Sequence, residues 1–271
     1  MAALPQVPRS VPTFAIVEGT FAPRRIKNSL TSFVIQHPDA TLIVDPSVCL
    51  DAEHRAIAQL PAVLRVAVRP PAETIPTIAA LRQLPSLPKP DFALPTHAHW
   101  DHVSGLLDMP GLPVHLHRPE REWVTSGPVA PVGGVRDSLR DRPVVDYELD
   151  GPPVLTFTRS HDLFGDNTVV LVDLAGHTPG QVGVLAHTKR GWILLAGDAA
   201  WHTLQIDKVR QKSSYPGGFA DHDRSETFRT LHRLHLARHS ATIIPTHDHD
   251  AGLQLSGDRR EDPPSSAAST R

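Results

Sequence analysis

The chain has 271 residues, of which 40% are hydrophobic, and its formal net charge at pH 7 is −2. This size allows a full core in one α/β domain or in two joined halves, while the charge and the scattered Lys and Arg argue against a nucleic-acid partner. The apolar stretches are too short to span a membrane, and the N-terminus lacks a signal-peptide pattern, so no membrane partner is expected. The single cysteine, Cys49, excludes an intrachain disulfide and fits a reducing compartment, which predicts a cytoplasmic protein.

The first half of the chain predicts short strands separated by turns and short helices. Strands are expected over apolar or alternating segments, namely Thr13–Val17, Thr31–Ile35, Thr41–Val44, Leu64–Val68, Phe92–Leu94 and Pro113–Leu116. Helices are expected over Ala52–Leu60, Thr74–Leu84 and Arg118–Val124. Residues 126–153 are rich in Gly, Pro and Arg with weak periodicity, so this stretch is either a lid over a site or a connecting loop.

The second half repeats this organisation, with strands expected over Thr168–Leu174, Gln181–Ala186, Gly191–Leu195 and Ala241–Pro245. The strongest helix signature covers Asp223–Arg238, where Asp223 and Glu226 form a capping pair and Phe228, Leu231 and Leu234 form an apolar stripe. We expect one domain over residues 1–254 and a disordered polar tail over 255–271. Two β-rich halves that each end in helices predict a two-sheet sandwich with helices outside.

Residues 96–102 read Thr-His-Ala-His-Trp-Asp-His and are the most informative segment of the chain. Imidazole and carboxylate are ligands of zinc and similar divalent metals. In extended backbone His97, His99 and Asp101 point the same way, and Asp101 is a candidate N-cap for a helix that begins at His102. A His-rich chain with 17 histidines could place some of them together on the surface. Three histidines and an aspartate within six positions after a strand favour a metal site instead.

Three later segments add ligand candidates, each where a strand passes into a loop. His177 lies in the Gly/Pro turn Ala-Gly-His-Thr-Pro-Gly, Asp198 ends an apolar strand after Gly197, and His247 follows the last strand. Rigid strands position such side chains, and the loops leave room for a substrate. His249 competes with His247 as a ligand, and it could alternatively help to orient the ligands.

In this order and spacing, the four motifs resemble the metallo-β-lactamase superfamily, most of all its N-acyl-homoserine lactonase branch. The resemblance implies an α/β fold in the form of an αββα four-layer sandwich. It also implies one metal bound by His97, His99 and His177 and a second bound by Asp101, His102 and His247, with Asp198 and a water or hydroxide bridging both. Asp101 and Asp198 would be catalytic, with Asp101 passing a proton to the leaving group. We expect Zn²⁺, although iron and manganese accept the same ligands.

The charge of such a centre favours hydrolysis. Two divalent cations outweigh Asp101, Asp198 and one bridging hydroxide, so residual positive charge would attract a carbonyl oxygen and stabilise an oxyanion. Metal binding lowers the pKa of water from about 15.7 to about 7, which provides hydroxide at neutral pH. The sequence therefore predicts a dinuclear zinc hydrolase that opens a small-molecule lactone or carboxylic ester.

Two residues are weaker candidates for substrate contacts. The lactonases carry a tyrosine three residues after the bridging aspartate, where this chain has Trp201. An indole donates one hydrogen bond but cannot accept one, so Trp201 either forms an apolar wall for an acyl chain or packs the following segment. His161 lies before the His177 turn and has either a substrate contact or a role in a turn.

Other functions remain open at this stage. The ligand pattern also resembles that of class II glyoxalases, which are thioesterases. Those enzymes usually carry a C-terminal domain, for which this chain has little room after His247. Persulfide dioxygenases also resemble it and hold a single iron, so metal content would distinguish them. A non-catalytic binding module ranks last because the ligand set is complete. A homodimer is compatible with the sequence.

Overall fold

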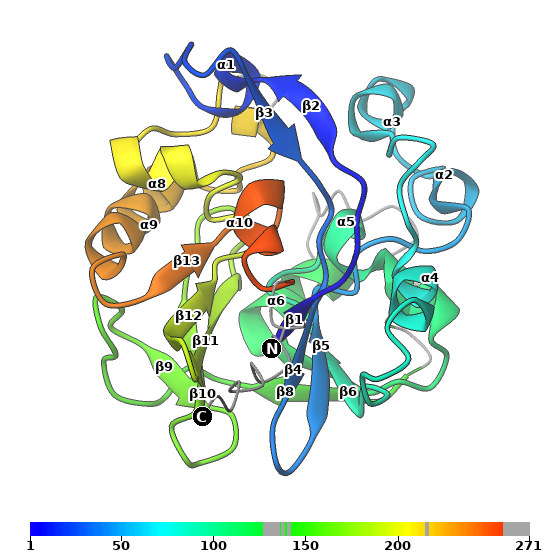
Figure 1. Ribbon diagram of the computed structural model, residues 1–271, viewed down its shortest axis with the longest axis vertical. Coiled ribbons are helices and arrows are strands. Elements are labelled where there is room, and N and C mark those ends of the chain that lie inside the picture. The colour runs from blue at the N-terminus through cyan, green and yellow to red at the C-terminus, as the bar shows by residue number, and fades with distance from the viewer. Residues whose placement is uncertain (127–135, 137–138, 140–141, 215–216, 257–271) are drawn as a thin grey trace, which may run out of the picture.

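The computed structural model describes residues 1–126, 136, 139, 142–214 and 217–256. Two main sheets lie side by side in this part of the chain (Figure 1). The first has six strands in the order β1-β4-β5-β6-β7-β8, formed by Ala2–Ala3, Phe33–Gln36, Thr41–Val44, Phe92–Leu94, Val114–His117 and Val144–Tyr147. Strands β5 to β8 run parallel, so their carboxyl ends meet at one edge, where loops can carry functional side chains.

The second sheet has five strands in the order β13-β12-β11-β10-β9. They are formed by Thr242–Ile244, Gly191–Leu195, Val182–Thr188, Val169–Asp173 and Ser160–Asp162. Strand β13 is parallel to β12 and the remaining pairs are antiparallel. A separate hairpin pairs β2 (Arg9–Pro12) with β3 (Arg25–Asn28).

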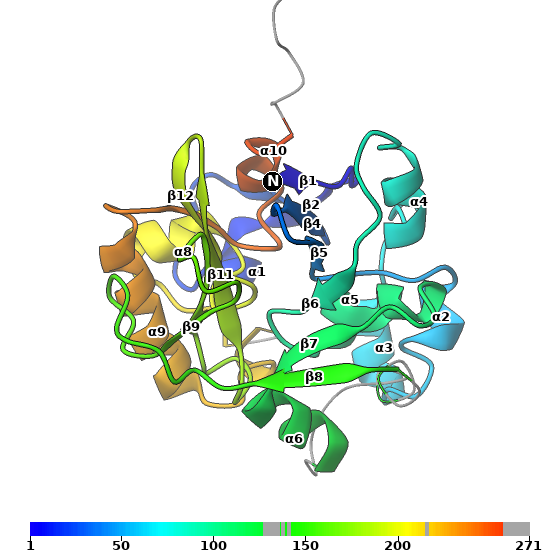
Figure 2. The ribbon, with the colours of Figure 1, turned by 90° about the horizontal axis from the view of Figure 1, so that it is seen from below.

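Helices cover the outer face of each sheet. Figure 2 shows α2 (Ala52–Arg55), α3 (Ala62–Val68) and α4 (Thr77–Arg82) outside the first sheet, with α8 (Thr203–Lys208) and α9 (Arg224–Ala237) outside the second. The other helical elements are α1 (Thr13–Ile16), α5 (Trp100–Val103), η1 (Ser104–Asp108), α6 (Arg118–Ser126), η2 (Gly217–Phe219) and α10 (His249–Leu253). Among the described helices, none has the length and apolar character needed to cross a bilayer.

The side chains of the strands divide the core into three layers, because successive residues of a strand point to opposite faces. Phe33 and Leu42 pack between the sheets with Leu171 and Leu195. On the outer face of the first sheet, a second cluster contains Ile43 together with residues from the covering helices. A third cluster packs Leu194 of the second sheet against α9. Three apolar layers between four layers of structure confirm the predicted αββα sandwich.

Most predicted elements match, but two predicted strands are wrong. Residues 13–16 form the single turn α1, because the hairpin pairing ends at Pro12, which has no N–H with which to extend a ladder. The Val-rich segment 62–68 forms helix α3. Its side chains are largely exposed, and the strand preference of valine depends on a packed, half-buried surface. The helix expected over 52–60 contracts to α2.

The long helix α9 follows its sequence signature closely. The Asp223 side chain accepts a hydrogen bond from the Glu226 N–H, which satisfies one of the free donors at the helix start. Leu231 and Leu234 are buried while Phe228 is partly exposed, so the apolar stripe is narrower than predicted. At the C-terminus, Leu255 is buried in the core, and the rest of the predicted tail from residue 257 lies outside the described residues.

Candidate metal centre

Seven predicted ligands from four distant segments meet between the two sheets. The β6 strand ends at Leu94 and is followed by His97 and His99, while α5 carries Asp101 and His102. His177 lies in the turn between β10 and β11, Asp198 follows β12, and His247 follows β13. Three groups of ligand atoms, each within 4.8 Å of one another, are formed by His97, His99 and His177, by His97, His102 and Asp198, and by Asp101, His102 and His247.

The first group is a cluster of three buried imidazoles. His99 Nδ1 lies 2.9 Å from His97 Nε2 and 2.8 Å from His177 Nε2. Three nitrogens in this arrangement cannot all carry protons, but their lone pairs can share one cation. Burial lowers the pKa of His97 and of His99 well below the usual value, with added repulsion from neighbouring imidazoles. These rings are therefore neutral, as metal ligation requires.

Asp198 lies between this cluster and the group formed by Asp101, His102 and His247. Its Oδ2 is 3.3 Å from His177 Nε2, and its Oδ1 is 3.2 Å from His102 Nε2 and 3.1 Å from His247 Nε2. Asp198 Oδ1 and His102 Nε2 are buried atoms for which the described residues supply no hydrogen bond. Because such atoms are costly to bury unsatisfied, the donor set fits two adjacent cations with Asp198 between them.

Outer contacts fix the orientation of the ligand rings. The Nδ1 atom of His102 lies 3.0 Å from Asp45 Oδ2, that of His247 lies 3.0 Å from the Ser29 carbonyl, and that of His177 lies 2.9 Å from Asp221 Oδ1. Such partners hold the opposite nitrogen toward a metal. Asp45 and Asp221 were not predicted. The position of Asp45, directly after β5 at the same sheet edge as the heptapeptide, was a usable signal.

A buried carboxylate joins two of the ligand loops. Glu120 accepts a hydrogen bond from the Ala98 N–H at 2.8 Å and from the Gly180 N–H at 3.0 Å. Burial raises its pKa to about 7, although these bonds oppose the shift. Gly180 permits the approach, because a Cβ atom there would lie 2.2 Å from the backbone nitrogen of Glu120. Glu120 therefore sets the distance between the heptapeptide and the His177 turn.

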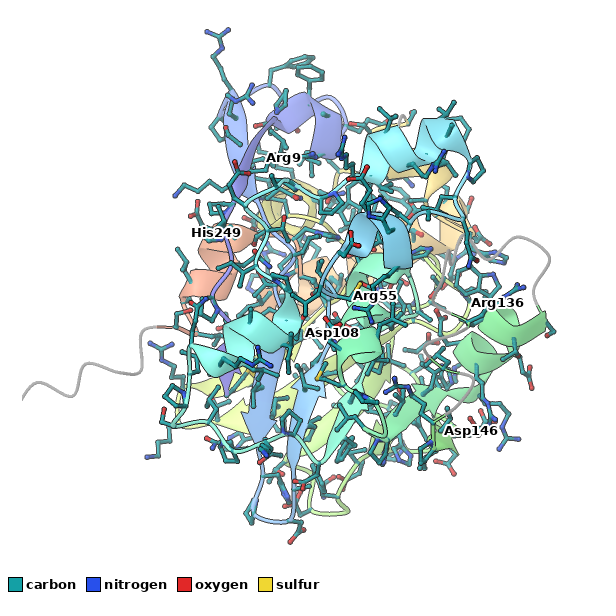
Figure 3. The ribbon with its side chains drawn as sticks, turned by 90° about the vertical axis from the view of Figure 1, so that its right-hand side faces the viewer. Arg9, Arg55, Asp108, Arg136, Asp146 and His249 are labelled. Atoms are coloured by element: carbon teal, nitrogen blue, oxygen red, sulfur yellow. The ribbon has the colours of Figure 1, made fainter. Side chains whose placement is uncertain are left out.

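Two predicted details need correction. Asp101 is not the N-cap of α5, because the helix begins at Trp100 after His99 and has no side-chain cap; Asp101 sits in the first turn and faces His247 Nε2 at 3.6 Å. His161 is on β9, stacked on Tyr147, and does not appear among the described residues that line the cavity. His249 lies on α10 (Figure 3) and belongs to none of the three ligand groups found among the described residues.

Trp201 is part of the centre. Its indole N–H donates a hydrogen bond to Asp198 Oδ2 at 2.6 Å, and its ring lies 5.9 Å from that of His247. A cavity of about 280 Å³ opens beside it and reaches His99, Asp101 and His247. Most of its wall is apolar and is formed by residues such as Ile16, Leu30, Leu60, Leu64, Val68 and Phe219. Arg9 lies on the hairpin strand β2 (Figure 3). It also borders the cavity.

Comparison with known proteins agrees with this geometry. The family model for the metallo-β-lactamase superfamily matches residues 28–247, which spans all seven predicted ligands. The chain belongs to this superfamily. Residues able to bind metal lie where the sequence motifs placed them.

Individual relatives are more distant. The chain is 31% identical over 121 residues to a probable metallo-hydrolase of Mycobacterium tuberculosis, covering 41% of this chain and 37% of that protein. It is 27% identical over 164 residues to the N-acyl homoserine lactonase AttM of Rhizobium radiobacter, covering 59% of each. These matches therefore span well under two thirds of the curated relatives.

Solved structures show the same fold at low identity. The Bacillus thuringiensis protein AiiA, in a mutant with N-decanoyl-L-homoserine bound, superposes with a TM-score of 0.66 at 14% identity over 93% of this chain and 94% of that one. AidC, described as a dizinc quorum-quenching lactonase, gives a TM-score of 0.61 at 11% identity over 90% and 85% of the two chains.

Proposed function

We propose that this protein is a dinuclear zinc hydrolase that opens a lactone or a carboxylic ester with an apolar acyl group. The observation that carries the proposal is the two ligand groups that lie on either side of Asp198 at the inner end of an apolar cavity. Small-molecule sites are typically concave and mostly apolar, with a few polar groups that fix orientation. The likeness to AttM, AiiA and AidC supports the same reaction class.

The predicted metal ligands and the cavity wall would have separate roles in the reaction. When bound, two zinc ions would supply hydroxide at neutral pH and polarise the substrate carbonyl. The apolar wall would hold the acyl group and exclude water from it. Asp101, with a partly exposed side chain at the cavity, would carry a proton to the leaving oxygen. Because Trp201 donates its N–H to Asp198 Oδ2, its role would be to hold this carboxylate and form the wall beside it.

A substrate panel tests the proposal. The zinc-loaded protein would be assayed with N-acyl homoserine lactones, aryl esters and thioesters of matched acyl length. We expect hydrolysis of lactones or esters to exceed that of thioesters, and longer acyl groups to lower KM because the cavity buries them. A preference for thioesters, or oxidation of a persulfide without hydrolysis of any ester, would contradict the proposal.

The wall itself can be tested with Leu64→Ser, which places a hydroxyl in the cavity. KM for a long-chain substrate should rise more than for a short-chain one, because only the long acyl group reaches the changed surface. Leu236→Ser is the matched control, since Leu236 is 60% exposed on α9 and is not among the described residues that line the cavity.

A further inference from the structure

Lys212 is a buried cation beside the ligand His177, and the chemistry proposed above does not use it. Its side chain is 0% exposed. Burying a lysine is costly, and a buried ion pair is a weak source of stability compared with apolar packing. A buried positive charge beside a site for metal cations is unfavourable, because like charges repel. The position of Lys212 therefore needs a specific explanation.

Lys212 contacts both the ligand His177 and the carboxylate beside it. Its Nζ lies 2.5 Å from Asp221 Oδ1 and 3.1 Å from His177 Nδ1, and the same Asp221 oxygen lies 2.9 Å from His177 Nδ1. The other oxygen, Asp221 Oδ2, is buried with no hydrogen bond from the described residues. Lys212 and His177 therefore share a single acceptor, and the lysine charge offsets most of the charge that Asp221 could direct at the imidazole.

The other outer carboxylate has a different environment. Asp45 Oδ2 faces His102 Nδ1 at 3.0 Å and accepts neutral hydroxyl groups of Thr96 at 3.0 Å and Thr246 at 3.1 Å. Its Oδ1 accepts the Thr96 N–H at 2.6 Å. These neutral donors hold Asp45 in place without cancelling its charge. A carboxylate partner raises the basicity of a ligating imidazole, so His102 receives more of this effect than His177.

Lys212 is also fixed in place. Its backbone forms an isolated β-bridge with Val17, and its carbonyl accepts a hydrogen bond from Arg224 Nη2 at 2.9 Å. Its Nζ lies 5.2 Å from the centre of the Trp201 ring, a cation–π distance. These contacts hold the lysine beside the ligand, where its positive charge opposes a cation on that imidazole.

We propose that Lys212 is a positioning residue that makes the two metal positions unequal: by sharing Asp221 with His177, it weakens the hold on a cation at His97, His99 and His177. A less basic His177 would leave a cation there more electron-poor, which favours ionisation of bound water. This inference rests on the proposed dinuclear site.

Zinc affinity tests it without any activity assay. The metal-free full chain and its Lys212→Met variant would be titrated with zinc against a competing chelator, with circular dichroism as the check of folding. In Lys212→Met we expect the affinity for one of the two zinc ions to increase by at least about tenfold and the affinity for the other to change little. A change of this size is within the range known for residues that contact metal ligands. In cadmium-113 NMR, one of two resonances should shift more than the other. Lys208→Met, an exposed lysine on α8, is the matched control and should leave both affinities unchanged.

A folded Lys212→Met variant with unchanged or weaker zinc binding would overturn the inference. If that variant does not fold, Lys212→Met combined with Asp221→Asn removes both buried charges together. The zinc affinity of this double variant should stay within about threefold of wild type. A loss of about tenfold or more, as is typical when an effective carboxylate partner is removed, would overturn the inference. Wild-type protein that takes up no zinc would overturn the proposed function and this inference together. Two bound zinc ions with equal affinities in wild type and Lys212→Met would overturn this inference alone.

Discussion

At the scale of single residues, the seven predicted ligands differ in how many of the ligand groups they belong to. Asp198 lies between the group of three histidines and the group of Asp101, His102 and His247. His99, His177 and His247 each belong to one ligand group, whereas His97 and His102 each belong to two. Loss of the shared carboxylate should therefore affect both metal positions, whereas loss of one outer ligand should affect mainly its own position.

The variants Asp198→Ala and His97→Ala test this difference. Both should abolish turnover while leaving most of the fold intact, because the ligands lie in loops at strand ends rather than inside the sheets. Asp198→Ala should lose both zinc ions. His97→Ala should lose at least the zinc at the three-histidine position. Metal analysis together with circular dichroism provides the readout, and full activity in either variant after metal depletion would contradict the assignment.

A second residue-scale prediction concerns Asp45. Asp45→Asn keeps an oxygen acceptor but removes the charge that faces His102 Nδ1. We expect zinc affinity to fall by about 10- to 100-fold at one position, the range measured for such partners. Chelator competition measures it. Asp39→Asn, in an exposed turn after β4, serves as the control, and equal affinities in the two variants would count against the role of Asp45.

That the candidate ligands belong together could be predicted from sequence, but the residues that contact them from outside could not. His97 to His102 lie within six positions, and His177 sits in a short turn motif, so local patterns reveal them. Asp45, Glu120, Lys212 and Asp221 are single residues in ordinary segments. Their roles depend on contacts across many positions of sequence, which single-sequence periodicity does not report.

At the scale of elements, the centre depends on how closely loops approach neighbouring backbone. Gly176 has φ of +134°, and a Cβ atom there would lie 2.3 Å from the Thr227 nitrogen at the start of α9. Gly180 meets α6 in the same way. The turn that carries His177 is thus pressed against two helices, and the ring position depends on both contacts.

Gly180→Ala should therefore destabilise the protein by about 1–3 kcal/mol, the usual cost of overpacking, and weaken zinc binding because the turn must move. The control is Gly252→Ala in α10, where the nearest atom would lie at 3.6 Å, an ordinary contact distance. Urea unfolding and zinc titration measure the two effects. Equal stability of the two variants would show that the approach of the turn to α6 is not tight.

Element type was predictable where tertiary packing agrees with local preference. Strand β5 has a continuous apolar run and helix α9 has a capping signal, and both formed where expected. Helix α3 shows the opposite case, because its valines suggest a strand but the segment lies exposed on the outside of the sandwich. Of the uncertain region 126–153, the strand β8 now closes the first sheet at Val144–Tyr147. Residues 127–135, 137–138 and 140–141 lie outside the described part, so its role as a lid stays a prediction.

At the scale of the whole molecule, the centre joins the two halves of the sandwich. His97 and His102 come from the first sheet's side, while His177, Asp198 and His247 come from the second. A ligand that binds only the folded state raises stability by mass action. When free zinc is present at 100 times its Kd, removing it with a chelator should therefore lower the Tm by about 5–10 °C for each zinc ion lost. Calorimetry before and after zinc is restored measures this, and a Tm that does not respond to zinc would contradict the placement of the centre between the halves.

Zinc binding should also depend on pH in a definite direction. Burial opposes charge on His102 and His247, but Asp198 outweighs it and raises both pKa values above the usual value. Zinc must displace those protons, so its affinity should fall as the pH decreases below these raised pKa values, and more protons should be released per zinc at about pH 7 than at about pH 9. Calorimetric titration in buffers of different ionisation enthalpy counts these protons. An equal count at both pH values would refute the expectation.

The number of metal ions that the folded chain holds is the most direct test of the dinuclear centre. Elemental analysis of the purified protein after gel filtration in metal-free buffer measures this. Seven predicted ligands, in two groups with Asp198 between them, predict about two zinc ions per chain, since each position offers the three or four ligands that zinc takes. About one iron per chain and no zinc, or no retained metal of any kind, would contradict the dinuclear zinc centre.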